Sequence, residues 1–363
     1  MRIIRNYIIF EILAAFFVCI FIFVFVLIAG RFVGMADLII NKGVSIFDIS
    51  RVLLLLIPYM LAISIPMAFL TGCIFIFGRM SSDNEISALL SSGISFSKII
   101  IPVIYLSVLI SFVCLYIHDR VVPSTRFKSR QIIKSIGLKE PTAFLEPGIF
   151  IKQFEPYVIY IGEIKKGIMH RVCIYQPERG KPTRTIFARR AETLPSDDDQ
   201  SVRLKLYNGA TDEPDPNDPN SFFKIMFDEY IITLHIPEDS YSGTIEKKPR
   251  EMTIQEIKNQ IKELEAKSIN TAPLSTEIQW KMSLSFACIP FAIIALPIAV
   301  RIRRAEKSVA FGISLLIILI YYLIFLLSQM LAIEGKIEPY FLWFANIMFT
   351  AAGILFINYE NYR

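Results

Sequence analysis

The sequence lacks the motifs of several enzyme classes. It contains no G-x-x-x-x-G-K-[ST] loop, which excludes ATP binding through a P-loop. It also contains neither H-E-x-x-H nor G-x-S-x-G, the motifs of zinc peptidases and of α/β-hydrolase nucleophiles. The three histidines, His118, His170 and His235, are far apart, and no Cys/His group has the spacing of a zinc site. We therefore expect no catalytic residues, no cofactor and no metal in this chain.

Cysteine and charge are also scarce. Four of the 5 cysteines lie in apolar runs and only Cys173 lies in the polar middle of the chain, so no disulfide framework is expected. Charged residues make up 20% of the chain against 54% hydrophobic residues, and the mean hydropathy is +0.50. The net charge of +5 is modest and suggests no nucleic-acid surface. A soluble domain of this length would be less apolar, so the composition indicates a membrane protein.

The apolar residues are concentrated in runs that could cross a membrane, which takes about 20 residues for a helix. The expected spans are 12–30, 52–78, 99–117, 282–300, 308–333 and 340–359. The first run shows no small-residue cleavage site, so we interpret it as an anchor and not as a removed signal peptide. Pro58 and Pro66 are candidate kink points in the second run. The chain is thus expected to be a membrane α-helical protein with three spans on either side of a large insert.

The distribution of Lys and Arg predicts the orientation of these spans, because basic residues favour the cytoplasmic loops. With a cytoplasmic N-terminus, the inner segments hold Arg2, Arg5, Arg79, Lys98, Arg301, Arg303, Arg304, Lys307 and Arg363. The short outer loops then hold only Arg31, Lys42, Arg51 and Lys336. We expect both termini in the cytoplasm and the insert outside it.

The insert has the pattern of a β domain. Segments rich in β-branched and aromatic residues alternate with turn-forming clusters, at 143–152, 157–164, 171–175, 183–190, 202–207 and 222–236. Short strands with such punctuation are typical of a sandwich or barrel. Acidic clusters at 197–199 and 212–218 fit no EF-hand pattern, and we interpret them as solvated loop tips.

A helical connector follows the expected strands, near 253–267. Thr253 and Glu256 have the spacing of a capping box, and an apolar stripe follows at Ile254, Ile257, Ile261 and Leu264. Two interpretations stay open. The helix is either a lever that joins the insert to the fourth span or a helix that packs on the sheet.

A second helical segment is expected in the loop between the second and third spans, near 82–93. Ser82 and Glu85 have capping-box spacing, and Gly93 stands where a helix end often needs a left-handed residue. The apolar face would consist of Ile86, Leu89 and Leu90. This segment is either a loop with one capped turn or a surface that another protein binds.

Few charges lie near the expected spans, and none lies at the centre of a run, which argues against an intramembrane ion pathway. Arg31 ends the first span, where it either snorkels to the interface or meets an anionic lipid, since Arg binds phosphate in a bidentate manner. His118 and Asp119 stand together at the outer end of the third span. An interfacial polar pair explains them more simply than a proton relay does.

Three stretches resemble the F and G permeases of the lipopolysaccharide export ABC transporter. They are the opening Arg5-Asn6-Tyr7 with Glu11, the loop segment from Glu85 to Ser95, and the apolar Leu-Pro stretch 294–299 in the fourth span. The expected topology is similar as well. The resemblance covers nearly the whole chain.

The resemblance implies a fold, a function and partners. The fold would be six transmembrane helices around a periplasmic β-jellyroll-like domain, with the divisions 1–118, 119–280 and 281–363. The chain would be an inner-membrane permease without enzymatic activity, driven by a cytoplasmic ATPase dimer and paired with a paralogous or identical six-span permease. Further partners would be a single-span jellyroll subunit and a periplasmic bridge.

The resemblance also implies roles for particular residues. The loop from Ser82 to Gly93 would carry a coupling helix that docks into the ATPase, with Glu85, Ile86, Leu89, Leu90 and Gly93 as its coupling residues. Arg31 would contact lipopolysaccharide. The alternative function is a membrane-anchored periplasmic receptor or scaffold without transport activity, although the chain has no cytoplasmic output domain of the kind that such a receptor usually carries.

Overall fold

The computed structural model describes residues 2–40, 44–139, 147–148, 150–151, 156–165, 168–177, 184–194, 201–214, 222–235, 247–267, 269–301 and 307–361. Six helices among them are long and apolar enough to cross a membrane, three before the β insert and three after it. The predicted three-plus-three arrangement is confirmed. The basic cluster 302–306, most of the first expected strand and the acidic clusters around 197–199 and 215–218 lie outside the described residues.

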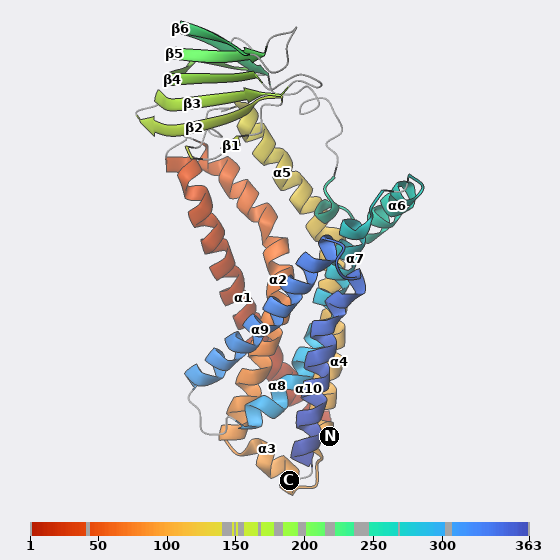
Figure 1. Cartoon of the computed structure of the whole chain (residues 1–363). Helices are drawn as coiled ribbons and strands as arrows, with labels where there is room; N and C mark the ends of the chain where they lie inside the picture. Colours follow the sequence, from red (N-terminus) through yellow and green to blue (C-terminus); the bar gives the residue numbers. More distant parts are fainter. Residues whose placement is uncertain are drawn as a thin grey trace. The chain divides into compact units, whose positions relative to one another are not determined.

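The helices of the first half are long, and the third span continues well beyond the expected end (Figure 1). They are α1 (Arg2–Ile40), α2 (Ile46–Ser82), the short α3 (Glu85–Ser91) and α4 (Phe96–Tyr116), which a π-helical turn η1 (Ile117–Val121) joins to α5 (Val122–Lys139). Pro58 and Pro66 both lie inside α2, which is one uninterrupted helix.

The second half begins with a 3-10 turn and the connector helix. The elements are η4 (Pro249–Glu251), α6 (Ile254–Glu265), α7 (Ala272–Ser285), α8 (Cys288–Arg301), α9 (Lys307–Ile333), η5 (Pro339–Trp343) and α10 (Phe344–Asn361). The fourth span is broken between α7 and α8, at Phe286 and Ala287. Pro290 explains the break, because it cannot donate to the Phe286 carbonyl and its ring crowds that carbonyl.

The insert forms one antiparallel sheet. Its strands are β1 (Phe150–Ile151), β2 (Val158–Lys165), β3 (Ile168–Gln176), β4 (Arg184–Leu194), β5 (Ser201–Pro214) and β6 (Phe222–His235). They pair in sequential order, so the described strands form an up-and-down meander and not the crossover that defines a jellyroll. The predicted β-rich insert is confirmed.

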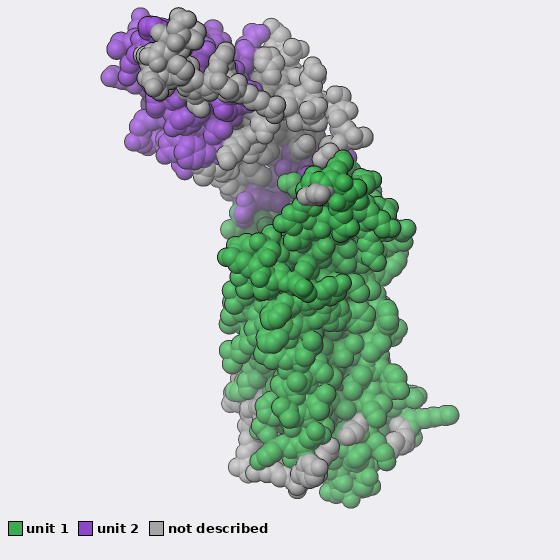
Figure 2. Space-filling model, turned by 45° about the vertical axis from the view of Figure 1, so that its right-hand side comes forward, with its two compact units in different colours: residues 1–33, 53–129, 247–363 green, residues 34–52, 130–246 purple. Residues whose placement is uncertain are grey.

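The chain divides into two compact units, shown in green and purple in Figure 2. Unit 1 comprises residues 1–33, 53–129 and 247–363, and unit 2 comprises residues 34–52 and 130–246. The connector helix α6 therefore groups with the spans, although the sequence suggested a middle domain that runs to residue 280. Its apolar stripe packs on Leu274 and Ile278 of α7, the first helix of the fourth span.

Each unit has its own core. In unit 1 the largest buried side chains come from several spans and include Phe69, Phe77, Phe291 and Tyr321. Helix α1 contributes only at its N-terminal part, where Gly72 of α2 lets the two backbones approach. A Cβ on Gly72 would lie 3.2 Å from the Phe16 nitrogen. Beyond Phe16, α1 presents no fully buried side chain among its described residues.

Candidate functional site

The turn before α3 differs from the predicted capping box. Ser82 is the last residue of α2, and its hydroxyl donates to the Gly78 carbonyl at 3.0 Å. The N-cap of α3 is Asn84, which has a left-handed backbone (φ 58°) and makes no side-chain cap hydrogen bond. Asn tolerates this conformation better than most residues, so it can reverse the chain within two residues of α2. The prediction of a Ser82–Glu85 box was wrong because the helix before the turn is longer than expected.

The other end of α3 follows the prediction. Gly93 has φ 78°, and the Gly93 and Ile94 N–H groups donate to the Leu90 and Leu89 carbonyls at 3.0 and 3.2 Å. This is a Schellman motif, which satisfies carbonyls that a helix end leaves unpaired. Of the expected apolar face, Ile86 is fully buried, Leu89 packs partly against the core and Leu90 is exposed. The helix is fixed on one side and free on the other.

Polar side chains from three helices meet beside α3. The Tyr7 hydroxyl of α1 lies 3.3 and 3.4 Å from the two carboxylate oxygens of Glu85. Arg79 of α2 donates to the Tyr7 hydroxyl at 3.0 Å through Nη2, and its Nη1 lies 3.1 Å from Oε2 of Glu11. We call Glu85, Tyr7, Arg79 and Glu11 the inner chain. Its carboxylates and guanidinium are partly exposed, so solvent reaches them.

A pocket of about 320 Å³ opens at the same place. It is lined by Ile4, Tyr7, Met80, Glu85, Ala88, Leu89 and Ser92. The lining is mainly apolar, with the Glu85 carboxylate at its wall. This pocket can receive an apolar side chain together with a cation or another hydrogen-bond donor.

Arg31 lies within α1, which continues through it to Ile40. Its side chain is exposed. No ion pair between described residues involves it. The apolar residues on the same helix are largely exposed too, with Phe21 and Phe25 at 73% and 63%. This part of α1 presents an apolar surface with one guanidinium.

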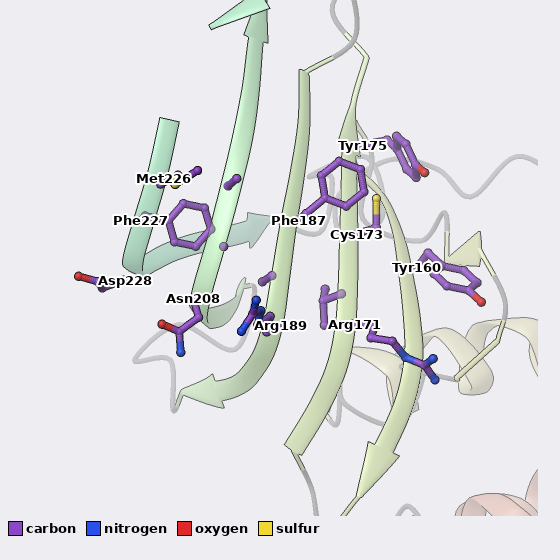
Figure 3. Close-up of a pocket in the computed structure, with 14 residues that line it drawn as sticks. Tyr160, Arg171, Cys173, Tyr175, Phe187, Arg189, Asn208, Met226, Phe227 and Asp228 are labelled. Carbon is purple, nitrogen blue, oxygen red and sulfur yellow. The ribbon is translucent and has the colours of Figure 1, made fainter. Parts of the chain in front are cut away.

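The sheet presents an amphiphilic face around a pocket of about 970 Å³ (Figure 3). The strand register places one residue from each strand in an apolar row, namely Phe150, Tyr160, Cys173, Phe187, Ala210 and Met226. Next to it stand the polar residues Arg171, Arg189, Asn208 and Asp228, which are spread from strand to strand across the lower part of the view in Figure 3. Arg171 and Asn208 have positive φ angles of 55° and 50°, which break the regular ladder at this level.

At the other end of unit 1, polar contacts fix the connector. Asp119 accepts a hydrogen bond of 2.6 Å from the Ile254 N–H at the start of α6. The predicted capping box is present: the Glu256 N–H donates to the Thr253 hydroxyl at 3.2 Å, and the Thr253 N–H donates to Glu256 at 2.8 Å. Burial alone raises the pKa of Glu256, but hydrogen bonds from Lys247 and Thr253 outweigh it and lower the pKa. The connector is thereby bound to the third span.

Two buried charges lie beside this connector. Glu277 and Lys281 of α7 are 6% and 1% exposed. The Lys281 ammonium donates to the Met252 carbonyl, and Arg250 Nε lies 3.7 Å from Oε2 of Glu277. We call these residues with Asp119 the outer cluster. This cluster was not predicted, because the fourth span was expected to begin at Met282, although Glu277 and Lys281 have the i, i+4 spacing of a helical ion pair.

The expectation for His118 was wrong. His118 is fully buried in the π-helical turn η1 and does not pair with Asp119 at an interface. Its Nδ1 lies 3.3 Å from the Cys114 carbonyl, and its ring packs on Trp280 at 5.2 Å between centroids. Adjacent residues of a helix do not face each other, and here Asp119 reaches α6 while His118 is buried in the bundle.

Comparison with known proteins decides the family. The model of the family "Lipopolysaccharide export system permease LptF/LptG" matches residues 6–359. The chain belongs to this family. The match includes all six candidate spans almost entirely and the whole sheet, so the resemblance inferred from short motifs is confirmed over nearly the full chain.

One further protein is also similar to this chain. Over 195 residues the chain is 20% identical to the uncharacterized protein RP871 of Rickettsia prowazekii (strain Madrid E). The alignment covers 53% of each chain, so the chain spans about half the length of this relative. Because this relative is uncharacterized, it indicates no activity, and the assignment to the family depends on the LptF/LptG match.

In this LptF/LptG permease, some of the predicted site residues lie together and others lie apart. Glu85 and Leu89 line the same pocket, and Ile86 anchors the helix that carries them. Leu90 faces away from the core, and Arg31 lies on another helix without contact to this group. Tyr7, Glu11 and Arg79 were not predicted as site residues. The N-terminal Tyr7 and Glu11 had been noted only as part of the family resemblance.

Proposed function

We propose that this chain is a permease subunit that moves lipopolysaccharide out of the inner membrane, driven by ATP hydrolysis in a separate ATPase. The family match over residues 6–359 carries the proposal. The absence of a P-loop from the sequence supports a separate source of energy. ATP binding and hydrolysis in the partner would shift the populations of two states of the spans.

The α3 end of unit 1 would lie in the cytoplasm and the sheet in the periplasm. The charge distribution of the short loops supports this orientation, because Arg79, Lys98 and Arg301 all belong to the α3 side. The indole of Trp343 and the ring of Tyr340, at the start of the sixth span, are residue types that favour a membrane interface.

Helix α3 would be the coupling helix that docks into a cytoplasmic ATPase dimer. It is fixed by Ile86 and the Schellman turn, yet it offers an exposed Leu90 and a pocket beside Glu85. A surface that is rigid on its inner side and open on its outer side is suited to transmitting a push, because displacement of α3 cannot be absorbed within the helix itself.

The lipid would follow two amphiphilic surfaces. On α1, Arg31 would bind a phosphate group while the exposed phenylalanines contact acyl chains. On the sheet, the apolar row and the neighbouring Arg171 and Arg189 offer the same combination. A second six-span permease would pair with this chain. A single-span jellyroll subunit and a periplasmic bridge would then receive the lipid.

The experiment is reconstituted export with the Glu85→Ala variant. We expect the complex to assemble with its ATPase and to release lipopolysaccharide at least several-fold more slowly. Asp83→Ala, an exposed acid in the preceding turn, is the matched control and should transport normally. Export at the wild-type rate in Glu85→Ala would refute the coupling role. Purification of the chain without any ATPase would instead favour the receptor or scaffold.

A further inference from the structure

Helix α1 packs against the rest of unit 1 mainly through one half of its length. Its fully buried residues are Ile8, Ile12 and Phe16, all in the half of the helix nearest α3. Only 11% of the most apolar window of α1 is buried, against 44% for α2 and 50% for α4. Within unit 1, helix α1 is thus buried at one end only among its described residues, and it presents most of its length to lipid or to a partner.

The buried end of α1 is bonded to α3 through side chains. The Tyr7 hydroxyl contacts both Glu85 oxygens and receives a hydrogen bond from Arg79, which also pairs with Glu11 one turn further along α1. The inner chain therefore connects α3 to α1 through Tyr7 and ties both Tyr7 and Glu11 to the end of α2. Arg79 fixes the position of the hydroxyl that faces Glu85.

We infer that Tyr7 and Arg79 are positioning residues that transmit movement of the coupling helix to α1. This inference rests on the proposed function of α3. When the ATPase displaces α3, the contact between Glu85 and Tyr7 opens or closes, which releases or holds the end of α1 that is buried in unit 1. Because the rest of α1 is weakly packed, a small displacement at Tyr7 swings its far half, which carries Arg31.

The distances within the inner chain suit a contact that changes during a cycle. The Tyr7–Glu85 separations of 3.3 and 3.4 Å are long for a hydroxyl and a carboxylate, whereas the Arg79–Tyr7 bond of 3.0 Å is ordinary. A carboxylate has about four acceptor positions, so Glu85 can bind a donor from the ATPase as well. A cation from the partner that draws Glu85 away would loosen the hold on Tyr7 and leave Arg79–Glu11 intact.

The test measures lipid released per ATP hydrolysed in the reconstituted complex. Tyr7→Phe keeps the ring and removes only the hydroxyl. We expect it to lower the ratio at least threefold with ATPase binding and hydrolysis retained. Arg79→Lys, which keeps the charge but replaces the two nitrogens that bind Tyr7 and Glu11 with one, should act in the same direction. Tyr105→Phe makes the same chemical change at an exposed position of α4 and should leave the ratio unchanged.

Two further measurements separate transmission from a merely structural role. Spin labels on the far half of α1 and on α4 should show a nucleotide-dependent distance change that Tyr7→Phe abolishes. Tyr7→Phe combined with Glu85→Ala should lower the ratio no more than the stronger single variant, because both remove the same hydrogen bond. A wild-type ratio in Tyr7→Phe, with Glu85→Ala still defective, would overturn this inference alone. A normal Glu85→Ala variant would overturn the coupling role of α3 itself.

Discussion

The two ends of unit 1 both join three or more elements through charged side chains, yet they differ in burial. In the inner chain, Arg79 and Glu11 are 34% and 28% exposed at the side chain, and their partners can exchange with water or with another protein. In the outer cluster, Lys281 is 1% exposed and its ammonium is committed to the Met252 carbonyl. The comparison teaches that similar chemistry serves a movable joint at one end and a fixed one at the other.

Burial explains the difference physically. An exposed ion pair contributes little to stability, because water solvates both charges well when the pair is open. When one member of a buried ion pair is removed, the remaining charge stays desolvated without a partner, which costs several kcal/mol. Opening the outer cluster is therefore costly, whereas opening the inner chain is cheap enough to occur in each transport cycle.

The largest effect is expected for Lys281→Met. Loss of the ammonium leaves the buried Glu277 with Arg250 as its nearest described cation and removes the bond to the connector, which should destabilise the protein by about 3–5 kcal/mol. Thermal unfolding in detergent measures this as a lowered midpoint. The double variant Lys281→Met with Glu277→Gln should recover a large part of the loss. Equal midpoints for Lys281→Met and wild type would show that the outer cluster is not a fixed joint.

An intermediate, local effect is expected from acid at the connector. The folded-state pKa of Glu256 is lower than its ordinary value of 4.5, so its stabilising contribution is complete above that value and is lost as the pH falls through the lowered one. Protection of the α6 amides from hydrogen exchange, corrected for intrinsic rates, should therefore decline in acid. The Glu256→Gln variant should show less protection at neutral pH and a flatter pH profile. A profile identical to wild type would contradict this cause.

The smallest effect on stability is expected for Arg79→Met, the same replacement of a cation as in Lys281→Met. Because the pair with Glu11 is partly exposed, we expect a loss of less than about 1 kcal/mol. The unfolding midpoint of the purified chain measures it, with Lys281→Met as the reference. A loss as large as that of Lys281→Met would remove the distinction between a movable and a fixed joint.

The sequence predicted the features that depend on local pattern. Apolar run length placed all six spans, and alternation with turn residues placed the six strands of the insert. Thr253 and Glu256 formed the expected capping box, and Gly93 took the expected left-handed conformation. Each of these depends on residues within a few positions of one another, so the chain itself holds the information.

The errors arose where helix ends or distant contacts decide. The Ser82–Glu85 box failed because α2 continues to Ser82, four residues beyond the expected end of the second span at Gly78. His118 and Asp119 were treated as a pair because they are adjacent in sequence, but adjacent helical residues do not face each other, and one is buried in the bundle while the other bonds to α6. The fourth span was started too late because Glu277 and Lys281 look unsuited to a membrane until their partners are known.

The amino-acid sequence by itself determined the class, the number of spans, the β insert and the family, because these follow from composition, periodicity and short motifs. Only the tertiary structure decided which charges matter. It brought Tyr7 to Glu85 across 78 positions and Asp119 to the connector across 135 positions. Such contacts depend on how helices pack, and packing depends on the shape and volume of the whole core rather than on any local stretch.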